Sequence, residues 1–261
     1  MLILISTPIG NLADISERAL EALKTSDLIL CEDTRHSGIL LHHYGIKRPL
    51  QSFHQFNEKK HEDKLIENLQ TGATITLISD AGTPALCDPG QKLVNRCHDE
   101  KIVVSAIPGA CAVTMALSLS GFEIPPFQFG GFLPKKQGEL KTTLLRALFY
   151  PGVSCFYDTP HHIRDTLDTL KDIAPERRLC IAREMTKKHE EILRGTALEL
   201  KPILKGEFCL IIDRGPPPPE DLKALVSSLK KTFDLSEKSA IKIAAEIAHV
   251  SKQDLYSSYQ S

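Results

Sequence analysis

Residues Ala73 to Gly90, ATITLISDAGTPALCDPG, decide the fold. Their apolar, β-branched first part ends at Asp80 and enters a loop rich in glycine and proline. This is typical of a buried parallel strand followed by a ligand-facing loop. Open α/β sheets bind ligands at the carboxyl ends of their strands. Gly82 permits close approach of the backbone, and the Asp80 carboxylate can accept hydrogen bonds from amine or hydroxyl groups. A tight turn that binds nothing has the same pattern, so this loop alone leaves both interpretations open.

The same pattern recurs through the first 120 residues. Short apolar runs at 2–5, 28–31 and 102–105 predict further strands, and the amphipathic stretches between them predict helices. We expect Asp14 to cap the first of these helices. A polar cluster, Glu32-Asp33-Thr34-Arg35-His36, follows the second run and is expected to be a loop that lines a cleft or an internal ion pair. The alternation predicts a parallel α/β sheet with helices on both faces.

The composition changes at Phe122-Glu-Ile-Pro-Pro-Phe127. We therefore expect an N-terminal α/β domain over 1–121, a second α/β domain over 122–215 and a C-terminal helical extension over 216–261. Strand-like runs lie closer together in the second domain, which favours a mixed sheet. Its first strand carries alternating aromatic residues, which we assign to the core: Phe127, Phe129 and Phe132. The extension is expected to begin with a stiff spacer, Pro216 to Pro219.

Composition and missing motifs exclude several classes of protein. The 261 residues carry a formal net charge of −1, so no overall basic field attracts nucleic acid, and any such partner must be held by local patches. The seven cysteines form no C-x-x-C pair, which argues against a zinc site or a disulfide framework and favours reduced thiols in the cytoplasm. No apolar run reaches the length of a membrane span. Neither a P-loop nor a G-x-G-x-x-G loop after the first strand is present, which disfavours P-loop nucleotidases and nicotinamide-linked enzymes.

Six ordered motifs resemble the tetrapyrrole methylase superfamily, and within it the branch that methylates ribosomal RNA. The resemblance runs from the first strand to Asp213 and continues more weakly through the C-terminal helices. It lies in Ser6-Thr7-Pro8-Ile9-Gly10-Asn11-Leu12 with Asp14-Ile15, Glu32-Asp33-Thr34-Arg35, Ser79-Asp80-Ala81-Gly82-Thr83-Pro84 with Asp88-Pro89-Gly90, Pro108-Gly109, Gly131-Phe132-Leu133-Pro134, and Ala182-Arg183-Glu184 with Thr186-Lys187. One segment, Tyr157-Asp158-Thr159-Pro160-His161-His162, departs from the family's usual Tyr-Glu-Ser-Pro-His-Arg.

The resemblance implies an S-adenosyl-L-methionine (AdoMet)-dependent enzyme that 2′-O-methylates a cytidine ribose in the decoding centre of 16S rRNA. It implies the two-domain tetrapyrrole-methylase fold with the cofactor in the cleft between the domains, a homodimer, and the small ribosomal subunit as partner. No metal is implied. The cofactor contacts carried over by motif are Pro8, Asp80, Gly82, Thr83, Leu86, Cys111, Ala112, Tyr157 and Gly206.

Methyl transfer to a ribose hydroxyl requires a group that accepts the hydroxyl proton, and a carboxylate suits this role. The candidates are Glu32, Asp33 and Glu184. Contacts to RNA phosphate or sugar are expected from Arg35, Lys135 and Arg183, although Arg183 with Glu184 is equally consistent with an internal ion pair. Two alternatives stay open at this point, a methyltransferase that acts on a tetrapyrrole of the precorrin type and a non-catalytic RNA-binding factor for ribosome assembly.

Overall fold

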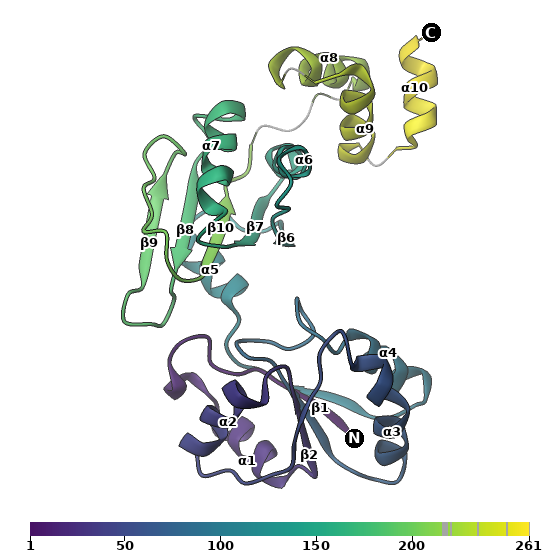
Figure 1. The fold of residues 1–261 in the computed structure, drawn as a ribbon. Coiled ribbons are helices and arrows are strands. Elements are labelled where there is room, and N and C mark those ends of the chain that lie inside the picture. The colour runs from purple at the N-terminus through teal and green to yellow at the C-terminus, as the bar shows by residue number, and fades with distance from the viewer. Residues whose placement is uncertain (216–218, 220, 234, 249, 261) are drawn as a thin grey trace. The chain divides into compact units, whose positions relative to one another are not determined.

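The computed structural model describes residues 1–215, 219, 221–233, 235–248 and 250–260 (Figure 1). The predicted spacer Pro216 to Pro219 lies outside the described residues, apart from Pro219. The chain divides into two compact units. The first unit comprises residues 1–112 with 185–187, and the second comprises 113–184 with 188–261. Each unit is built on a sheet of its own.

The first unit contains a five-stranded sheet in which every strand pair is parallel, which confirms the predicted sheet type. The strand order β3-β2-β4-β1-β5 places β1 and β4 at the centre. In register, Ile5 at the end of β1 lies between Ile78 of β4 and Ile107 of β5. The carboxyl ends of these strands therefore share one edge. The strands are β1 (Leu2–Ile5), β2 (Leu28–Cys31), β3 (Leu50–Ser52), β4 (Ile75–Ile78) and β5 (Val104–Ile107).

Helices cover both faces of this sheet (Figure 1). On one face, Leu2 and Leu77 pack with the apolar sides of α3 and α4, and on the other Ile5 and Ile78 pack with α1 and α2. Alternate residues of a strand point to opposite faces, so a strand that is covered on both sides reads as one continuous apolar run. The helices are α1 (Glu17–Thr25), α2 (Thr34–His43), α3 (Glu58–Gln70) and α4 (Gln91–Asp99), with a short 3₁₀ turn η1 (Leu12–Asp14). The next helix, α5 (Ala112–Ser120), belongs to the second unit from Val113 on.

Three expectations for this unit are wrong in detail. Ser16, not Asp14, caps α1, because Asp14 ends the preceding 3₁₀ turn and the Ser16 hydroxyl accepts a hydrogen bond from the amide of Ala19 at 3.2 Å. The strand expected at 102–105 corresponds to β5, which begins two residues later, at Val104. Ile102 is not part of it, because its amide closes the turn after α4 by donating to the Cys97 carbonyl. Finally, the polar cluster expected as a loop begins helix α2.

The second unit contains a mixed sheet, as predicted, in the order β6-β7-β10-β8-β9. Only β6 and β7 are parallel, and the other neighbours are antiparallel. Antiparallel neighbours need only short connections, which explains why these strands follow one another closely in the sequence. The strands are β6 (Phe127–Phe132), β7 (Val153–Asp158), β8 (Leu179–Arg183), β9 (Glu191–Gly195) and β10 (Phe208–Ile212).

The C-terminal helices belong to the same hydrophobic core as this sheet. Leu225 of α8 and Ile241 of α9 join a buried cluster with Leu144 of α6 and Leu210 of β10. A hydrogen bond from Lys141 Nζ to the Phe233 carbonyl, 2.8 Å long, also links α6 to the end of α8. The boundary predicted at residue 216 therefore coincides with no break in the core. The helices are α6 (Gln137–Phe149), α7 (Ile163–Ile173), α8 (Leu222–Phe233), α9 (Glu237–Ile247) and α10 (Lys252–Gln260).

The assignment of the β6 aromatic rings to the core is wrong for two of them. Phe127 is 44% exposed and Phe132 is 59% exposed. β6 is an edge strand whose register shifts between Phe129 and Phe132, so the alternation of its side chains is interrupted there. The rings of Phe129 and Phe132 both contact Tyr157, at centroid distances of 4.9 and 5.3 Å.

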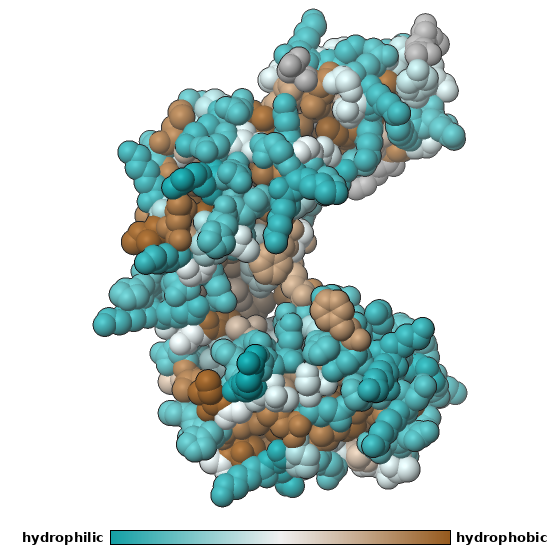
Figure 2. Space-filling view, viewed as in Figure 1, coloured by the Kyte–Doolittle hydropathy of each residue, from teal (hydrophilic) through white to brown (hydrophobic). Residues whose placement is uncertain are grey.

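The surface and the cysteines agree with the composition. Hydrophilic residues cover most of the surface seen in Figure 2, and apolar residues are confined to separate patches. All seven cysteines lie in the described part of the chain, and none of them forms a disulfide bond. None of the helices formed by the described residues is long and apolar enough to cross a membrane.

Candidate active site

Four loops meet at the carboxyl edge of the first sheet, and backbone hydrogen bonds join two of them directly. Thr7, in the loop after β1, forms an antiparallel bridge with Gly82, in the loop after β4. The two amides donate to the opposite carbonyls at 2.9 and 3.1 Å. The Thr7 hydroxyl also donates to the carbonyl of Ser79 at 3.0 Å. Pro8 and Gly82, both predicted as cofactor contacts, are therefore held in neighbouring segments.

A chain of hydroxyl groups connects the loop after β5 to the same two loops. The Thr83 hydroxyl lies 3.0 Å from the Ser6 hydroxyl and donates to the carbonyl of Ala110 at 3.2 Å. Gly109 comes so close to the β1 loop that a Cβ atom in its place would lie 2.9 Å from the Cβ of Ser6. Ala110 directly precedes Cys111 and Ala112, so the structure brings the three predicted cofactor segments of this unit together.

Gly82 is required by the conformation of its loop. Its φ angle is +82°, a region in which side chains are strained, and an added Cβ would lie 3.2 Å from Ile9. Leu86, further along the loop, is 42% exposed, and its side chain is therefore available to a ligand.

A small cavity of about 40 Å³ lies between the first of these loops and α2. It is lined by Thr7, Pro8, Leu12, His36, Ser37, Leu40, Ser79 and Asp80. Asp80 and Pro8 were predicted from the motifs. The α2 residues are not among the predicted ones, because a polar cluster such as Glu32 to His36 directly after a strand favours a loop. The signal that could have revealed them is Asp33, a good N-cap residue, followed by the apolar pair Leu40-Leu41 one to two turns later.

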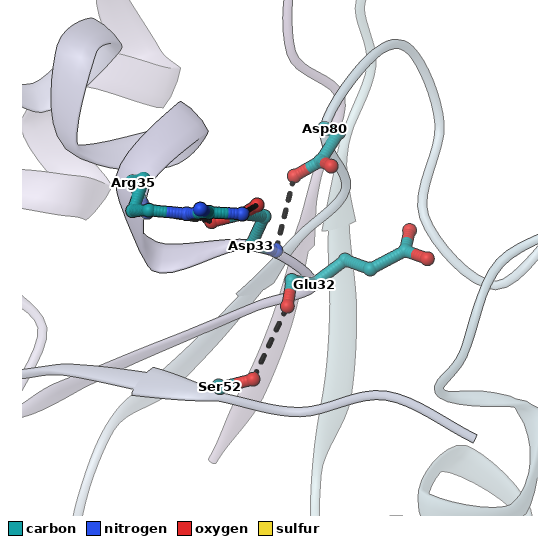
Figure 3. A network of polar contacts seen from close by, with 5 residues as sticks. All are labelled: Glu32, Asp33, Arg35, Ser52 and Asp80. Atoms are coloured by element: carbon teal, nitrogen blue, oxygen red, sulfur yellow. Dashed lines mark hydrogen bonds and ion pairs between the residues drawn. The ribbon is translucent and has the colours of Figure 1, made fainter. Parts of the chain in front are cut away.

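Acidic side chains gather beside this cavity at the ends of β2 and β4 (Figure 3). The amide of Asp33 donates to Asp80 Oδ1 at 3.2 Å, which ties the β2 end to the β4 loop. The carbonyl of Glu32 accepts from the Ser52 hydroxyl at 3.2 Å, so its backbone is fixed. In Figure 3 the Glu32 carboxylate points away from Asp33 and Arg35. The structure thus fixes the Glu32 backbone, and Glu32 is exposed as a residue although its carboxylate is partly buried.

The carboxylates of Glu32, Asp88 and Asp33 differ in pKa, and therefore in how readily they accept a proton. Partial burial, together with the nearby charges of Asp88 and Asp80, raises the pKa of Glu32. Burial and Asp80 raise the pKa of Asp88 as well. In contrast, hydrogen bonds from the Arg35 side chain and backbone hold the pKa of Asp33 well below its usual range. A carboxylate with a raised pKa is the better proton acceptor, which favours Glu32 over Asp33 as a general base.

Asp33 and Arg35 instead form a local structural pair at the start of α2. Asp33 Oδ1 accepts from the Arg35 amide at 2.8 Å, as an N-cap residue does, and the Arg35 guanidinium binds both carboxylate oxygens, at 3.1 and 2.7 Å. Arg35 nevertheless has an 89% exposed side chain. Its guanidinium can therefore reach a phosphate while it stays paired.

The remaining predicted residues belong to the second unit. Glu184 has a positive φ of 51°, and its carboxylate accepts a hydrogen bond from the amide of Glu207 at 3.0 Å. A Cβ atom added to Gly206 would lie 2.4 Å from the carboxyl carbon of Glu184. Gly206 is therefore packed against Glu184. Tyr157 lies near the end of β7, against the exposed ring of Phe132. Lys135 is exposed in the loop between β6 and α6.

The expectation that Arg183 contacts RNA is wrong, because the structure buries its side chain. The residue is 5% exposed, and its guanidinium donates to Glu191 Oε2 at 2.9 Å and to the carbonyls of Lys205 and His189 at 3.1 Å each. A guanidinium that is buried with its donors occupied holds together the segments it bonds. Arg183 therefore forms an internal ion pair, but its partner is Glu191 on β9 and not the expected Glu184.

Arg183→Gln is accordingly expected to destabilise the protein by about 1.5–3 kcal/mol, because Glu191 and two carbonyls lose a charged hydrogen-bond donor. Urea unfolding measures the change, with Lys171→Gln, on the surface of α7, as the matched control. An unchanged unfolding midpoint combined with weaker RNA binding would contradict the structural role.

Among the described residues, no group of three or more His, Cys, Asp or Glu side chains could hold a metal ion.

Comparisons with known proteins place the chain in a family. The family model of Tetrapyrrole (Corrin/Porphyrin) Methylases matches residues 1–201. The chain is 41% identical to "Ribosomal RNA small subunit methyltransferase I" of Haemophilus influenzae, over 98% of this chain and 95% of the relative, and 40% identical to the protein of the same name from Halalkalibacterium halodurans, over 99% and 94%.

Solved structures support the same fold. Diphthine synthase matches with a TM-score of 0.64 at 13% identity, covering 82% of this chain and 90% of that chain. Uroporphyrin-III-C-methyltransferase from Thermus thermophilus matches with a TM-score of 0.56 at 17% identity, covering 82% and 94%. These two likenesses concern the fold alone, whereas the family match and the close relatives span most or nearly all of the chain. The chain therefore belongs to the tetrapyrrole methylase family, and within it to the ribosomal RNA small subunit methyltransferase I group.

Proposed function

We propose that this protein is an AdoMet-dependent methyltransferase that 2′-O-methylates a cytidine ribose in the decoding centre of 16S rRNA. The observation that carries the proposal is the identity of about 40% over nearly the whole chain with relatives named ribosomal RNA small subunit methyltransferase I. The joined loops of the first unit add support, because they present backbone groups and carboxylates at the edge of the sheet where open α/β folds bind ligands.

The residues of this edge fit AdoMet by their chemistry. AdoMet carries a positively charged sulfonium and an amino group, and three carboxylates lie near one another here, on Glu32, Asp80 and Asp88. Because Asp80 and Asp88 raise the pKa of Glu32, the three carboxylates repel one another, and a bound cation would relieve that repulsion. Pro8, Gly82, Thr83, Leu86, Cys111 and Ala112 supply the loop segments around them, and Tyr157 and Gly206 are proposed as contacts from the second unit.

The cofactor, when bound, supplies a methyl group that is already activated for transfer. The chain's contribution is then to hold the ribose oxygen in line with the methyl carbon and to accept the hydroxyl proton. We assign the proton to Glu32, an exposed residue whose carboxylate points away from the Asp33–Arg35 pair and has a raised pKa. Arg35 and Lys135, both exposed, are proposed to contact phosphate or sugar.

Asp80→Asn tests the electrostatic part of this assignment. The Asn amide oxygen can still accept the Asp33 N–H, but one of the negative charges that, together with partial burial, raise the pKa of Glu32 is lost. A base works only when deprotonated, so a lower Glu32 pKa is expected to move the acid limb of the pH–rate profile to lower pH. The measurement is methyl transfer against pH, with Asp63→Asn on α3 as control. An acid limb at the wild-type position in Asp80→Asn would remove Asp80 from this role.

The partner and the oligomeric state follow from the same proposal. Small ribosomal subunits are the proposed substrate, which implies a cytoplasmic location. We also propose a homodimer, as the resemblance implies, and the exposed rings of Phe127 and Phe132 supply apolar surface that a second copy can bury.

The test is incubation of the protein with radiolabelled AdoMet and unmethylated small subunits, followed by nucleoside analysis of the rRNA. We expect label in 2′-O-methylcytidine. Binding to the subunits without transferred label would support a non-catalytic assembly factor. Label transferred only to a precorrin-type tetrapyrrole, supplied in a parallel incubation, would support the other alternative. Either outcome would overturn the proposal.

A further inference from the structure

A second and larger cavity, of about 410 Å³, lies in the second unit. It is formed where the loop after α7 enters β8 and where the chain leaves β10. Its lining consists of Ala174, Pro175, Glu176, Arg177, Arg178, Asp213, Arg214 and Gly215. Nothing in the methyl-transfer reaction uses these residues.

The cavity lies at the opposite end of the sheet from the predicted site residues of this unit. In the antiparallel pair of β8 and β10, Leu179 is opposite Ile212 and Arg183 is opposite Phe208. Arg178 and Asp213 therefore extend one end of the pair, while Glu184 and Gly206 lie beyond the other end. The two groups are separated by the length of β8.

Two arginines build the cavity wall. Arg177 is half-buried, and its guanidinium donates to the carbonyl of Asp213 at 2.9 Å and to that of Leu148 at 3.3 Å. Burial lowers the pKa of Arg177, so its charge is incompletely solvated. Arg178 binds Asp213 Oδ2 at 2.6 Å but keeps 69% of its side chain exposed. Arg177 thus fixes the loop and contributes positive charge, while Arg178 faces solvent.

Further guanidinium groups continue the positive surface from the cavity rim. The ring of Phe122 lies under two arginines, Arg178 just before β8 and Arg194 on β9. Their guanidinium carbons lie 5.6 and 5.2 Å from the ring centroid. Arg214 lines the cavity and pairs with Glu123. The acidic groups that face these arginines are Asp213, Glu123 and Glu176, and the Asp213 carboxylate is buried and already accepts from Arg178 and from the Arg214 amide.

We propose that this cavity and its arginine rim, Arg178, Arg194 and Arg214, bind backbone phosphates of the rRNA substrate at a docking site separate from the methyl-transfer site. The inference rests on the proposed function. The planar guanidinium group of arginine can bind two phosphate oxygens at once, and the Phe122 ring packs against those of Arg178 and Arg194. Because the whole chain has a net charge of −1, affinity for RNA must come from local groups of this kind.

The test compares Arg178→Gln/Arg194→Gln with Arg18→Gln/Arg164→Gln, a control that removes two exposed arginines from α1 and α7. The docking variant, Arg178→Gln/Arg194→Gln, is expected to bind 16S rRNA about tenfold more weakly than wild type at physiological salt. The slope of the logarithm of its binding constant against the logarithm of the salt concentration is expected to be smaller in magnitude by about two. AdoMet affinity and the rate at saturating subunits should stay within twofold of wild type. Arg178→Lys/Arg194→Lys should recover much of the affinity, since it restores the charge.

The outcomes separate this inference from the proposed function. If the wild type methylates subunits and the docking variant matches the control in affinity and slope, the docking site is wrong while the proposed function stands. If the wild type transfers no methyl group but the docking variant alone loses RNA affinity, the proposed function is wrong and the site stands as an RNA contact. Circular dichroism and urea unfolding verify that each variant is folded.

Discussion

Glu32→Gln is expected to slow methyl transfer to the small subunit by about 10²- to 10⁴-fold, because an amide cannot accept the ribose proton. Gln has nearly the shape of Glu, and the Glu32 backbone is held by Ser52, so the fold of the β2 end should persist. Affinity for AdoMet should fall much less than the rate, because Asp80 and Asp88 keep their charges when the Glu32 charge is lost. The main loss is therefore expected in kcat, with a smaller loss in cofactor binding.

Single-turnover transfer of labelled methyl groups measures this rate, and calorimetry measures AdoMet binding. Glu21→Gln, on the exposed side of α1, is the control for loss of an acidic charge. Glu184→Gln provides a second comparison, because the Glu184 carboxylate already accepts the Glu207 amide and is expected to act structurally. A wild-type rate in Glu32→Gln together with a large loss in Glu184→Gln would move the base to Glu184.

Gly90→Ala is expected to destabilise the first unit by about 2–5 kcal/mol, the sum of about 1–2 for a side chain at positive φ and about 1–3 for overpacking. Gly90 has a φ angle of +123°, and an added Cβ would lie 2.4 Å from Leu77 Cδ2. Leu77 is 2% exposed and packed in the core, so it cannot move aside freely. The Gly90 amide also donates to the buried carboxylate of Glu58 at 3.2 Å, a bond that a shifted backbone would weaken.

Gly72→Ala separates the two causes. Gly72 also has a positive φ, +99°, but no neighbouring atom lies within 4 Å of an added Cβ. Its substitution should therefore cost only the strain, about 1–2 kcal/mol. Urea unfolding of both variants gives the difference. Equal destabilisation would show that the contact with Leu77 contributes nothing.

The sheets could be predicted from sequence because their strands are short apolar runs that must be buried on both faces. Leu2–Ile5 and Ile75–Ile78 show this directly. Helix α2 was missed because its first residues are polar, and a polar cluster after a strand suggests a loop until Asp33 is recognised as a cap. The β6 rings were misassigned because alternation predicts one buried face only when the strand keeps its register, and β6 does not.

The candidate site could be predicted only in part. The loops at Pro8, Gly82 and Cys111 follow from their positions after parallel strands and from the family motifs. Their connection through Thr7, Thr83 and Ala110 depends on tertiary distances that no local pattern encodes. The same holds for Arg183, whose positive charge suggests a contact with RNA. In the structure Arg183 is buried, and its guanidinium donates to three acceptors that lie 6 to 22 residues away in the sequence.

Photolabelling by AdoMet tests the central claim most directly, because it asks where on the chain the methyl donor binds. The full-length protein is irradiated with radiolabelled AdoMet, digested, and the labelled peptides are identified by mass spectrometry. The account predicts label in the segments 6–12, 79–90 and 108–112, which excess unlabelled AdoMet abolishes. Saturable label that is absent from all three segments, or no saturable label at all, would contradict it.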